Sequence, residues 1–292
     1  MSWGSPMAVT GPGADIASRE LGLTYFDAAR YRPRDRLSLS FQEGMNPPTA
    51  RKLSVRVGVL IQTRERSTVG PDCRLATLGT RSVLTQVVQR VRGLDDIEGC
   101  AILTGTDARD HGVVEVARLQ GLPYFRSPAD RPGQAMRYAV TQLGWDAVIA
   151  IRCDSPLISV DLLEQARRRF IEGDYDLVSV GAEQGFPLGL EVEIIRSRWL
   201  IARAPLIRLA DERQPLLSWF QPTVPRFATL ALSDQTDWSD VSLAIESPQD
   251  LEQMRWLSQA HGTSLWHWPW EVVAAEVRRW GASRLSSDEA AA

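Results

Sequence analysis

The sequence predicts an α/β fold in which a doubly wound, mostly parallel, Rossmann-like sheet lies between two layers of helices. Apolar runs of strand length alternate with amphipathic helical segments from residue 55 onward. The central run, AVIAIRCDSPL at 147–157, is apolar enough for a strand that is buried on both faces, as strands of parallel sheets are. Such alternation also implies right-handed crossovers between neighbouring parallel strands.

The amino-terminal half of the predicted sheet consists of repeated strand–helix units. Its expected strands are 55–62, 100–103, 122–125 and the central run that starts at 147. The first expected helix begins near residue 80. Two more helices are expected at 108–120 and 134–143. In the first of these helices apolar residues recur at i, i+3, i+4 and i+7, so we expect one face to pack on the sheet.

The carboxyl-terminal half continues the pattern with less regular spacing. A helix is expected at 160–171, and strands are expected at 177–180, within 185–195, at 227–232 and at 242–246. The helix after Glu246 has a well-specified start. Ser247 is a good N-cap, Pro248 suits the first helical position, and an acid at 250 belongs in the first turn.

We expect three regions along the 292 residues. Residues 1–52 have Gly-Pro pairs and little periodicity, which predicts a poorly ordered arm. The same pattern would arise if translation began near Met45 and the assigned start codon lay too far upstream. Residues 53–262 form the α/β domain. Residues 263–292 form a Trp-rich helix and a tail that is disordered from Ser283. The tryptophans at 266, 268, 270 and 280 predict a packing or self-association surface, and hence a homodimer.

The composition disfavours several classes of function. A formal net charge of -3, with 33 Lys and Arg spread along the chain, gives no reason to expect nucleic acid as a partner. No apolar run reaches membrane-spanning length and the amino terminus lacks the pattern of a leader peptide, so we expect a cytoplasmic protein without membrane insertion. The three cysteines lack the spacing of a zinc site.

Acidic residues follow two of the expected strands. Asp154 lies at the carboxyl end of the central strand, and Glu246 lies at the end of 242–246. Ligands bind at this edge of an open α/β sheet, so the two carboxylates are candidates to meet there and hold a divalent cation. Alternatively, Asp154 accepts hydrogen bonds in a strand-to-helix turn or caps the next helix, and Glu246 only precedes a well-capped helix.

The loop after the first strand is rich in hydrogen-bond donors but matches neither the dinucleotide fingerprint nor a Walker loop. Its donors are Arg64, Arg66, Ser67, Thr68 and Arg74. Guanidinium groups, hydroxyls and a helix amino terminus together favour an anionic ligand. A solvated polar loop with incidental arginines is the alternative.

A second pair of acids, Glu191 and Glu193, lies where a Gly-Pro-Gly loop opens into alternating residues. The period of two places both glutamates on the same face of a strand. Such a pair can bind sugar hydroxyls or a basic residue. Two solvent-facing glutamates on an edge strand are the alternative.

Four short motifs occur in order between residues 55 and 259. They are Gln62, Arg64, Ser67, Thr68 and Pro71; Asp154, Pro156 and Leu157; the segment 189–193; and Glu246, Ser247, Pro248 and Asp250. In this order the chain resembles the cytidylyltransferases of the spore-coat-polysaccharide branch of the acylneuraminate cytidylyltransferase-like, or CMP-sugar synthetase, family. The resemblance implies a nucleotide-diphospho-sugar transferase fold of the glycosyltransferase-A-like type.

The resemblance also implies an activity. A cytidylyl group would move from CTP to a sugar or sugar-like hydroxyl, with release of pyrophosphate, in surface polysaccharide or glycan biosynthesis. Asp154 and Glu246 would hold Mg²⁺ and, with Arg64, would form the catalytic set. Glu191 and Glu193 would face the acceptor. The nucleotide would contact Gln62, Arg64, Ser67, Thr68 and Arg74.

Departures from the family pattern leave other hypotheses open. Family members usually have glycines where this chain has Arg66 and Asp72, and a lysine where it has Cys73. Gln134 and residues 214–215 replace a basic residue and a Glu-His pair, which predicts an altered acceptor site. One alternative is a catalytically degenerate relative that binds a nucleotide or a partner. Another is a glycosyltransferase that uses a finished nucleotide sugar and releases no pyrophosphate.

Overall fold

The computed structural model describes residues 40–44, 55–63, 72–128, 132–203, 224–232 and 237–291. All of these residues belong to one unit, Leu37–Ala292. No helix within the described ranges is long and apolar enough to cross a membrane.

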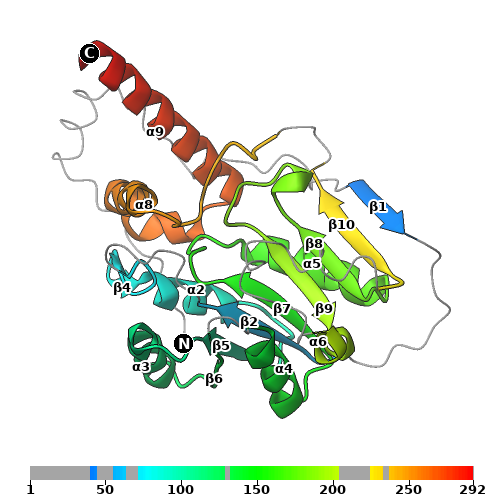
Figure 1. Cartoon of the computed structure of the whole chain (residues 1–292). Coiled ribbons are helices and arrows are strands. Elements are labelled where there is room, and N and C mark those ends of the chain that lie inside the picture. The colour runs from blue at the N-terminus through cyan, green and yellow to red at the C-terminus, as the bar shows by residue number, and fades with distance from the viewer. Residues whose placement is uncertain are drawn as a thin grey trace, which may run out of the picture. The chain divides into compact units, whose positions relative to one another are not determined.

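The centre of the fold is an eight-stranded sheet with the strand order β1-β10-β8-β9-β7-β2-β5-β6 (Figure 1). The strands are β1 (Ser40–Gly44), β2 (Val57–Gln62), β5 (Cys100–Thr104), β6 (Tyr124–Arg126), β7 (Ala147–Arg152), β8 (Leu177–Val180), β9 (Val192–Arg196) and β10 (Phe227–Ala231). Four neighbouring pairs are parallel, namely β10–β8, β7–β2, β2–β5 and β5–β6. Strand β9 is antiparallel to both β7 and β8, and β1 is antiparallel to β10. The predicted mostly parallel α/β sheet is confirmed.

Helices cover both faces of the sheet. They are α2 (Val83–Val91), α3 (His111–Leu119), α4 (Pro132–Leu143), α5 (Val160–Glu172), α6 (Ser197–Arg203), α8 (Pro248–His261) and α9 (Trp270–Ala291). Successive residues of β7 alternate between two buried clusters. Ala147, Ile149 and Ile151 belong to the cluster that contains residues of α2, α5 and α8, whereas Val148 and Ala150 belong to the cluster with α4 and α6. The strand is therefore buried on both faces, as predicted.

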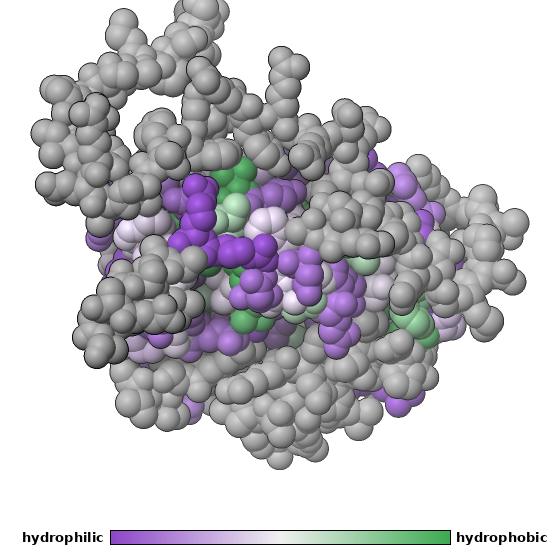
Figure 2. Space-filling model, turned by 90° about the horizontal axis from the view of Figure 1, so that it is seen from above, coloured by the Kyte–Doolittle hydropathy of each residue, from purple (hydrophilic) through white to green (hydrophobic). Residues whose placement is uncertain are grey.

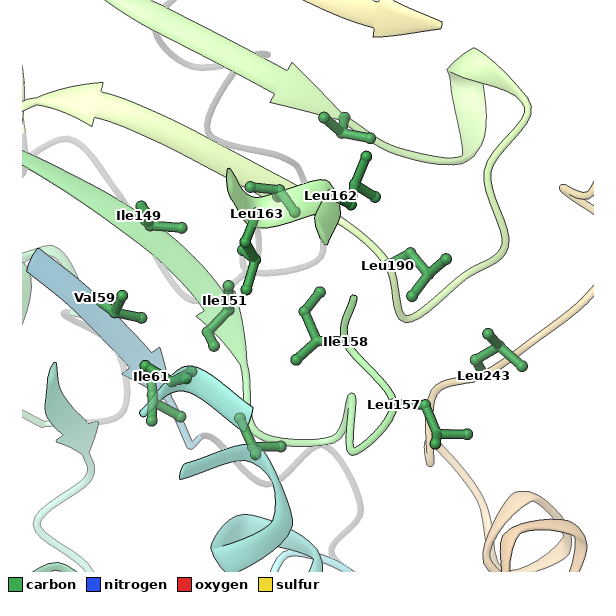
Figure 3. Close-up of a cluster of buried hydrophobic side chains, with 14 of the residues drawn as sticks. Val59, Ile61, Ile149, Ile151, Leu157, Ile158, Leu162, Leu163, Leu190 and Leu243 are labelled. Carbon is green, nitrogen blue, oxygen red and sulfur yellow. The ribbon is translucent and has the colours of Figure 1, made fainter. Parts of the chain in front are cut away.

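The larger of the two clusters extends to the carboxyl edge of the sheet (Figure 3). Leu157 and Ile158 come from the turn after β7, and Leu190 and Leu243 come from two later segments of the chain. All four side chains are at most 2% exposed. Burying a leucine or isoleucine side chain stabilises the fold by roughly 1.5–3 kcal/mol, so this turn is firmly anchored.

The carboxyl-terminal half differs from the prediction at residues 242–246, which do not form a strand. They make one isolated parallel bridge, between Leu188 and Ser242. The amide of Leu243 donates to the carbonyl of Leu188 at 2.7 Å, and the amide of Leu188 donates to the carbonyl of Val241 at 3.0 Å. Because the segment pairs with a loop and not with a strand, it cannot extend into a ladder.

Three other boundaries also differ from the prediction. The helix expected near residue 80 begins at Val83, after the hairpin of β3 (Thr77–Leu78) and β4 (Arg81–Ser82), because the Ser82 hydroxyl accepts from the Thr85 amide and caps it there. Strand β1 lies within the region expected to be a poorly ordered arm. Helix α9 continues to Ala291 through the expected tail, where Ala, Arg, Leu and Glu favour helix.

The tryptophans of the carboxyl-terminal region pack within the chain. Trp270 is 7% exposed, and its ring centroid lies 5.6 Å from that of Phe186 and 6.2 Å from that of Trp238. Trp256 of α8 and Trp280 of α9 lie 6.0 Å apart. The tryptophans therefore join α8 and α9 to the domain, and they give no support to the predicted homodimer.

Candidate functional site

The candidate site lies at the carboxyl edge of β7. Two backbone hydrogen bonds hold the residues that follow this strand: the Cys153 amide donates to the carbonyl of Gln62 at 2.9 Å, and the Ile245 amide donates to the carbonyl of Asp154 at 2.8 Å. The second bond brings a late segment of the chain against the end of β7. Figure 2 views the molecule from above, onto the face toward which β8 and β10 point in Figure 1. This face carries a band of hydrophilic residues.

Asp154 and Glu246 are brought together by Arg152, the last residue of β7. Nε of Arg152 donates to Oδ1 and Oδ2 of Asp154 at 2.8 and 3.1 Å. Its Nη2 donates to Oδ2 of Asp154, and to Oε1 of Glu246 at 2.7 Å. Arg152 and Glu246 are 94 positions apart in the sequence. The predicted meeting of the two carboxylates therefore occurs, and it occurs around a shared guanidinium.

The electrostatics of Arg152 reflect this arrangement. Burial alone would lower the pKa of Arg152, but the charge and hydrogen bonds of Asp154 and Glu246 outweigh burial and raise that pKa above its ordinary value. The side chains of Arg152, Asp154 and Glu246 remain 22%, 18% and 34% exposed. A ligand can thus reach all three.

The start of α8 fixes the backbone of Glu246. Oδ2 of Asp250 accepts from the amide of Glu246 at 3.0 Å and from the amide of Ser247 at 2.8 Å, and the Ser247 hydroxyl accepts from the Asp250 amide at 3.2 Å. The predicted N-cap Ser247 and the predicted Pro248 in the first turn are confirmed, and the reciprocal bonds with Asp250 complete a capping box. The helix cap and the acid at 246 are therefore one local structure.

Glu191 and Glu193 do not form a pair on an edge strand. Glu191 precedes β9, and its Oε2 accepts from the Gly189 amide at 2.7 Å. Glu193 is in β9, which lies between β7 and β8, and it is 9% exposed. Burial raises the pKa of Glu191, although Arg152 and the backbone amides lower it. Glu191 is therefore electrostatically coupled to the carboxyl edge of β7, whereas Glu193 is part of the sheet.

The predicted phosphate loop is described only at its two ends. Arg64, Arg66, Ser67 and Thr68 lie outside the described residues. Gln62 ends β2.

Arg74 lies at the far end of this loop and is 4% exposed. Its guanidinium donates to Asp72 at 2.7 and 2.9 Å, to Oδ1 of Asp110 at 2.7 Å and to the carbonyl of Thr63. Burial alone would lower the pKa of Arg74, but the two aspartates raise it. Arg74 thus joins the two ends of the loop and the segment after β5.

Two residues near the site were missed by the sequence analysis. Arg152 interrupts an apolar strand two positions before Asp154, and a period of two places both on one side of the chain, so the signal was present. Arg90 of α2 donates from Nε to the carbonyl of Pro156 at 3.0 Å, and burial lowers the pKa of Arg90 to about 10. Cys153 is not a candidate nucleophile, because burial raises the pKa of its thiol.

The MobA-like NTP transferase domain matches residues 67–236, more than half of the chain. This chain belongs to that family of nucleotidyltransferases. The matched range contains Asp154 and β9 and ends before Glu246. The narrower spore-coat or acylneuraminate branch stays a prediction.

Solved structures similar to this nucleotidyltransferase support the fold. A cytidylyltransferase from Leptospira borgpetersenii serovar Hardjo-bovis has a TM-score of 0.67 and 23% identity, covering 78% of this chain and 96% of the other. A CMP:2-keto-3-deoxy-manno-octonic acid synthetase complexed with CTP has a TM-score of 0.53 and 13% identity, covering 70% and 98%. Identities this low show the shared fold alone.

One curated relative is similar in sequence over a shorter range. An uncharacterised protein of Methanocaldococcus jannaschii is 24% identical over 135 residues, which is 46% of this chain and 54% of that protein. The nucleotidyltransferase thus spans about half the length of the curated relative it matches.

The donor atoms at the carboxyl edge suit a hard divalent cation. Within the described ranges no three His, Cys, Asp or Glu side chains form a metal-binding group. Magnesium, however, is commonly held by one or two protein carboxylates, with substrate phosphates and water completing its octahedron. Asp154 and Glu246 provide such a pair of carboxylates, and the nucleotide would provide the remaining oxygens.

Proposed function

We propose that this nucleotidyltransferase moves a cytidylyl group from CTP to a sugar or sugar-like acceptor and releases pyrophosphate. The observation that carries the proposal is the meeting of Asp154 and Glu246 at the carboxyl edge of β7. Ligands bind at this edge of α/β sheets, and phosphoryl transfer depends on positioning and on neutralising charge. The choice of CTP is supported by the structural neighbours, one a cytidylyltransferase and one a complex with CTP.

In the proposed reaction, Asp154 and Glu246 would hold Mg²⁺. When bound, the ion would neutralise charge on phosphate oxygens while the α-phosphate is attacked. The role of the two carboxylates is to fix its position at the edge of the sheet. Burial of Ile245 and Leu157 behind them keeps their backbone rigid.

The loop at residues 62–74 receives the nucleotide in this proposal. Asp72 would repel a triphosphate if its charge were exposed to it, but it forms a bidentate pair with Arg74. That pairing makes Arg74 a residue that positions the loop. The proposed contacts to the nucleotide are therefore made by Gln62, Arg64, Ser67 and Thr68.

Glu191 and Glu193 remain the proposed acceptor residues, with unequal support. The charges of Arg152 and Asp154 act on the pKa of Glu191, which supports a role for Glu191 beside them. Glu193 is buried between β7 and β8, and we assign it to shaping the floor of the site. The acceptor would hydrogen-bond through its hydroxyls to Glu191.

The test is a calorimetric titration of the full chain with CTP and Mg²⁺, with ATP and UTP for comparison, followed by an assay of pyrophosphate release. We expect CTP binding that needs Mg²⁺, and a loss of at least about 100-fold in turnover for Asp154→Ala. Glu115→Ala is the matched control, because this acid lies on α3, pairs with Arg118 and is 61% exposed.

Two results would contradict the proposal. A folded protein that binds none of the three nucleotides would support the degenerate, partner-binding relative. Release of a nucleoside diphosphate or monophosphate from a nucleotide sugar, without pyrophosphate, would support a glycosyltransferase.

A further inference from the structure

Arg152 occupies the position between the two carboxylates that the proposed function assigns to a cation. Its Nε contacts both oxygens of Asp154, and its Nη2 contacts Oδ2 of Asp154 and Oε1 of Glu246. Three of the four carboxylate oxygens of the pair therefore accept hydrogen bonds from one guanidinium.

Such an arrangement has a physical reason. Two carboxylates that approach each other repel, and the repulsion is stronger where the side chains are partly withdrawn from water. Asp154 and Glu246 are only 18% and 34% exposed. A positive charge between them offsets this repulsion, and the planar guanidinium can contact both at once.

We propose that Arg152 is a built-in counter-ion that holds Asp154 and Glu246 together, and that its guanidinium opposes the binding of a divalent cation to them. The inference rests on the proposed function, since it takes these two carboxylates as the cation ligands. Arg152 is then a positioning residue whose guanidinium competes with the cation for the same oxygen atoms.

The competition follows from the shared oxygen atoms and from the like charge of the two groups. A cation bound by one oxygen from each carboxylate needs Oδ1 or Oδ2 of Asp154, and both already accept from Arg152. A guanidinium and a divalent cation on the same oxygen would also repel each other. Each pairing therefore weakens the other, and the cation affinity of the free protein is set partly by Arg152.

The experiment is a titration of the full chain with Mn²⁺ alone, without nucleotide, following free Mn²⁺ by electron paramagnetic resonance. The variants are Arg152→Gln, which removes the charge, and Arg152→Lys, which keeps the charge but lacks the fork. We expect Arg152→Gln to bind Mn²⁺ roughly tenfold more tightly than the natural protein, equivalent to about 1.4 kcal/mol. Arg152→Lys should fall between the two.

Two controls separate a local effect from a general one. Arg118→Gln removes the same charge from a side chain of α3 that is 59% exposed, and it should leave the Mn²⁺ affinity unchanged. Adding Asp154→Ala to Arg152→Gln should abolish the gain. A residue with a purely structural role would leave the affinity unchanged or weaken it when removed.

The possible outcomes distinguish this inference from the proposed function. Mn²⁺ binding that is unchanged or weaker in both Arg152 variants would overturn the inference, while magnesium-dependent CTP binding lost in Asp154→Ala would leave the proposed function standing. Absence of Mn²⁺ binding in the natural protein and in both variants would overturn the inference as well. Binding seen only in Arg152→Gln would support it most strongly.

Discussion

The two edges of the sheet use aspartate–arginine pairs in opposite ways. At the carboxyl edge of β7 one arginine, Arg152, is shared by Asp154 and Glu246. At the amino ends of β8 and β10 the ion pairs join two aspartates to three arginines: Asp174 pairs with Arg196 and Arg226, and Asp176 pairs with Arg196 and Arg198.

The difference lies in the sign of the excess charge and in one fully buried carboxylate, that of Asp176. Asp176 is 1% exposed, whereas Asp154 is 18% exposed. Within the named ion pairs, the carboxyl edge has an excess of carboxylate and the amino edge an excess of guanidinium. We infer that the amino edge contributes more to stability, whereas the carboxyl edge carries the carboxylates of the proposed cation site.

The largest expected effect is on stability at the amino edge. Asp176→Ala should lower the free energy of unfolding by about 3 kcal/mol, because it leaves arginines without the buried charge that pairs with them. Asp154→Ala should lower it by about 1 kcal/mol or less, because its site is partly exposed. Urea unfolding of both variants measures the difference. Equal losses would show that the two edges do not differ as we infer.

The next effect tests whether backbone contacts fix the carboxyl edge. Gly189 has φ +94°, and a Cβ there would lie 2.6 Å from the amide nitrogen of Ala244. Gly189→Ala should therefore lower the free energy of unfolding by about 2 kcal/mol. Gly121 has φ +65°, but no atom lies within 4 Å of a Cβ built there. Gly121→Ala should therefore lower the free energy of unfolding by only about 1 kcal/mol. Thermal unfolding measures the stability lost in each variant. Equal losses would contradict the inference that backbone contacts fix the carboxyl edge.

The smallest effect concerns the negative charge gathered at the carboxyl edge. Because burial raises the pKa of Glu191, the native state holds its proton more tightly than the unfolded chain, whose pKa is near 4.5. This residue's contribution to stability is therefore lost as the pH rises above 4.5 and through the raised pKa. Glu191→Gln should gain stability relative to the natural protein as the pH increases. Unfolding measured from pH 4 to pH 8 tests this, and a difference that does not change with pH would contradict it.

The sheet could be predicted because hydrophobic periodicity alone identifies its buried strands. The antiparallel insertion of β9 was missed because alternation of strands and helices suggests parallel neighbours. The signal was the connection after β8, which contains only the 3₁₀ turn Ala182–Gln184 and is too short for a crossover helix. Strand β9 must therefore run back beside β8.

The site was predicted in part. Glu246 was predicted to lie at the site, but from the end of a strand that does not form. Asp154 follows a buried strand, as expected. Glu246 reaches the site from the capped start of α8 and not from the end of a strand. The contact between Arg152 and Glu246 joins distant parts of the chain, and local patterns carry no information about such tertiary pairs.

The hydrogen bond from the Ile245 amide to the Asp154 carbonyl has a consequence for folding order. Contacts between residues far apart in sequence form late, because a long loop must close before they contribute any stabilisation. During synthesis from the amino terminus, β2, β5, β6 and β7 can associate before residues 241–250 have left the ribosome. The nascent chain can therefore form the parallel block β7-β2-β5-β6 before this late segment docks and brings Glu246 to Arg152.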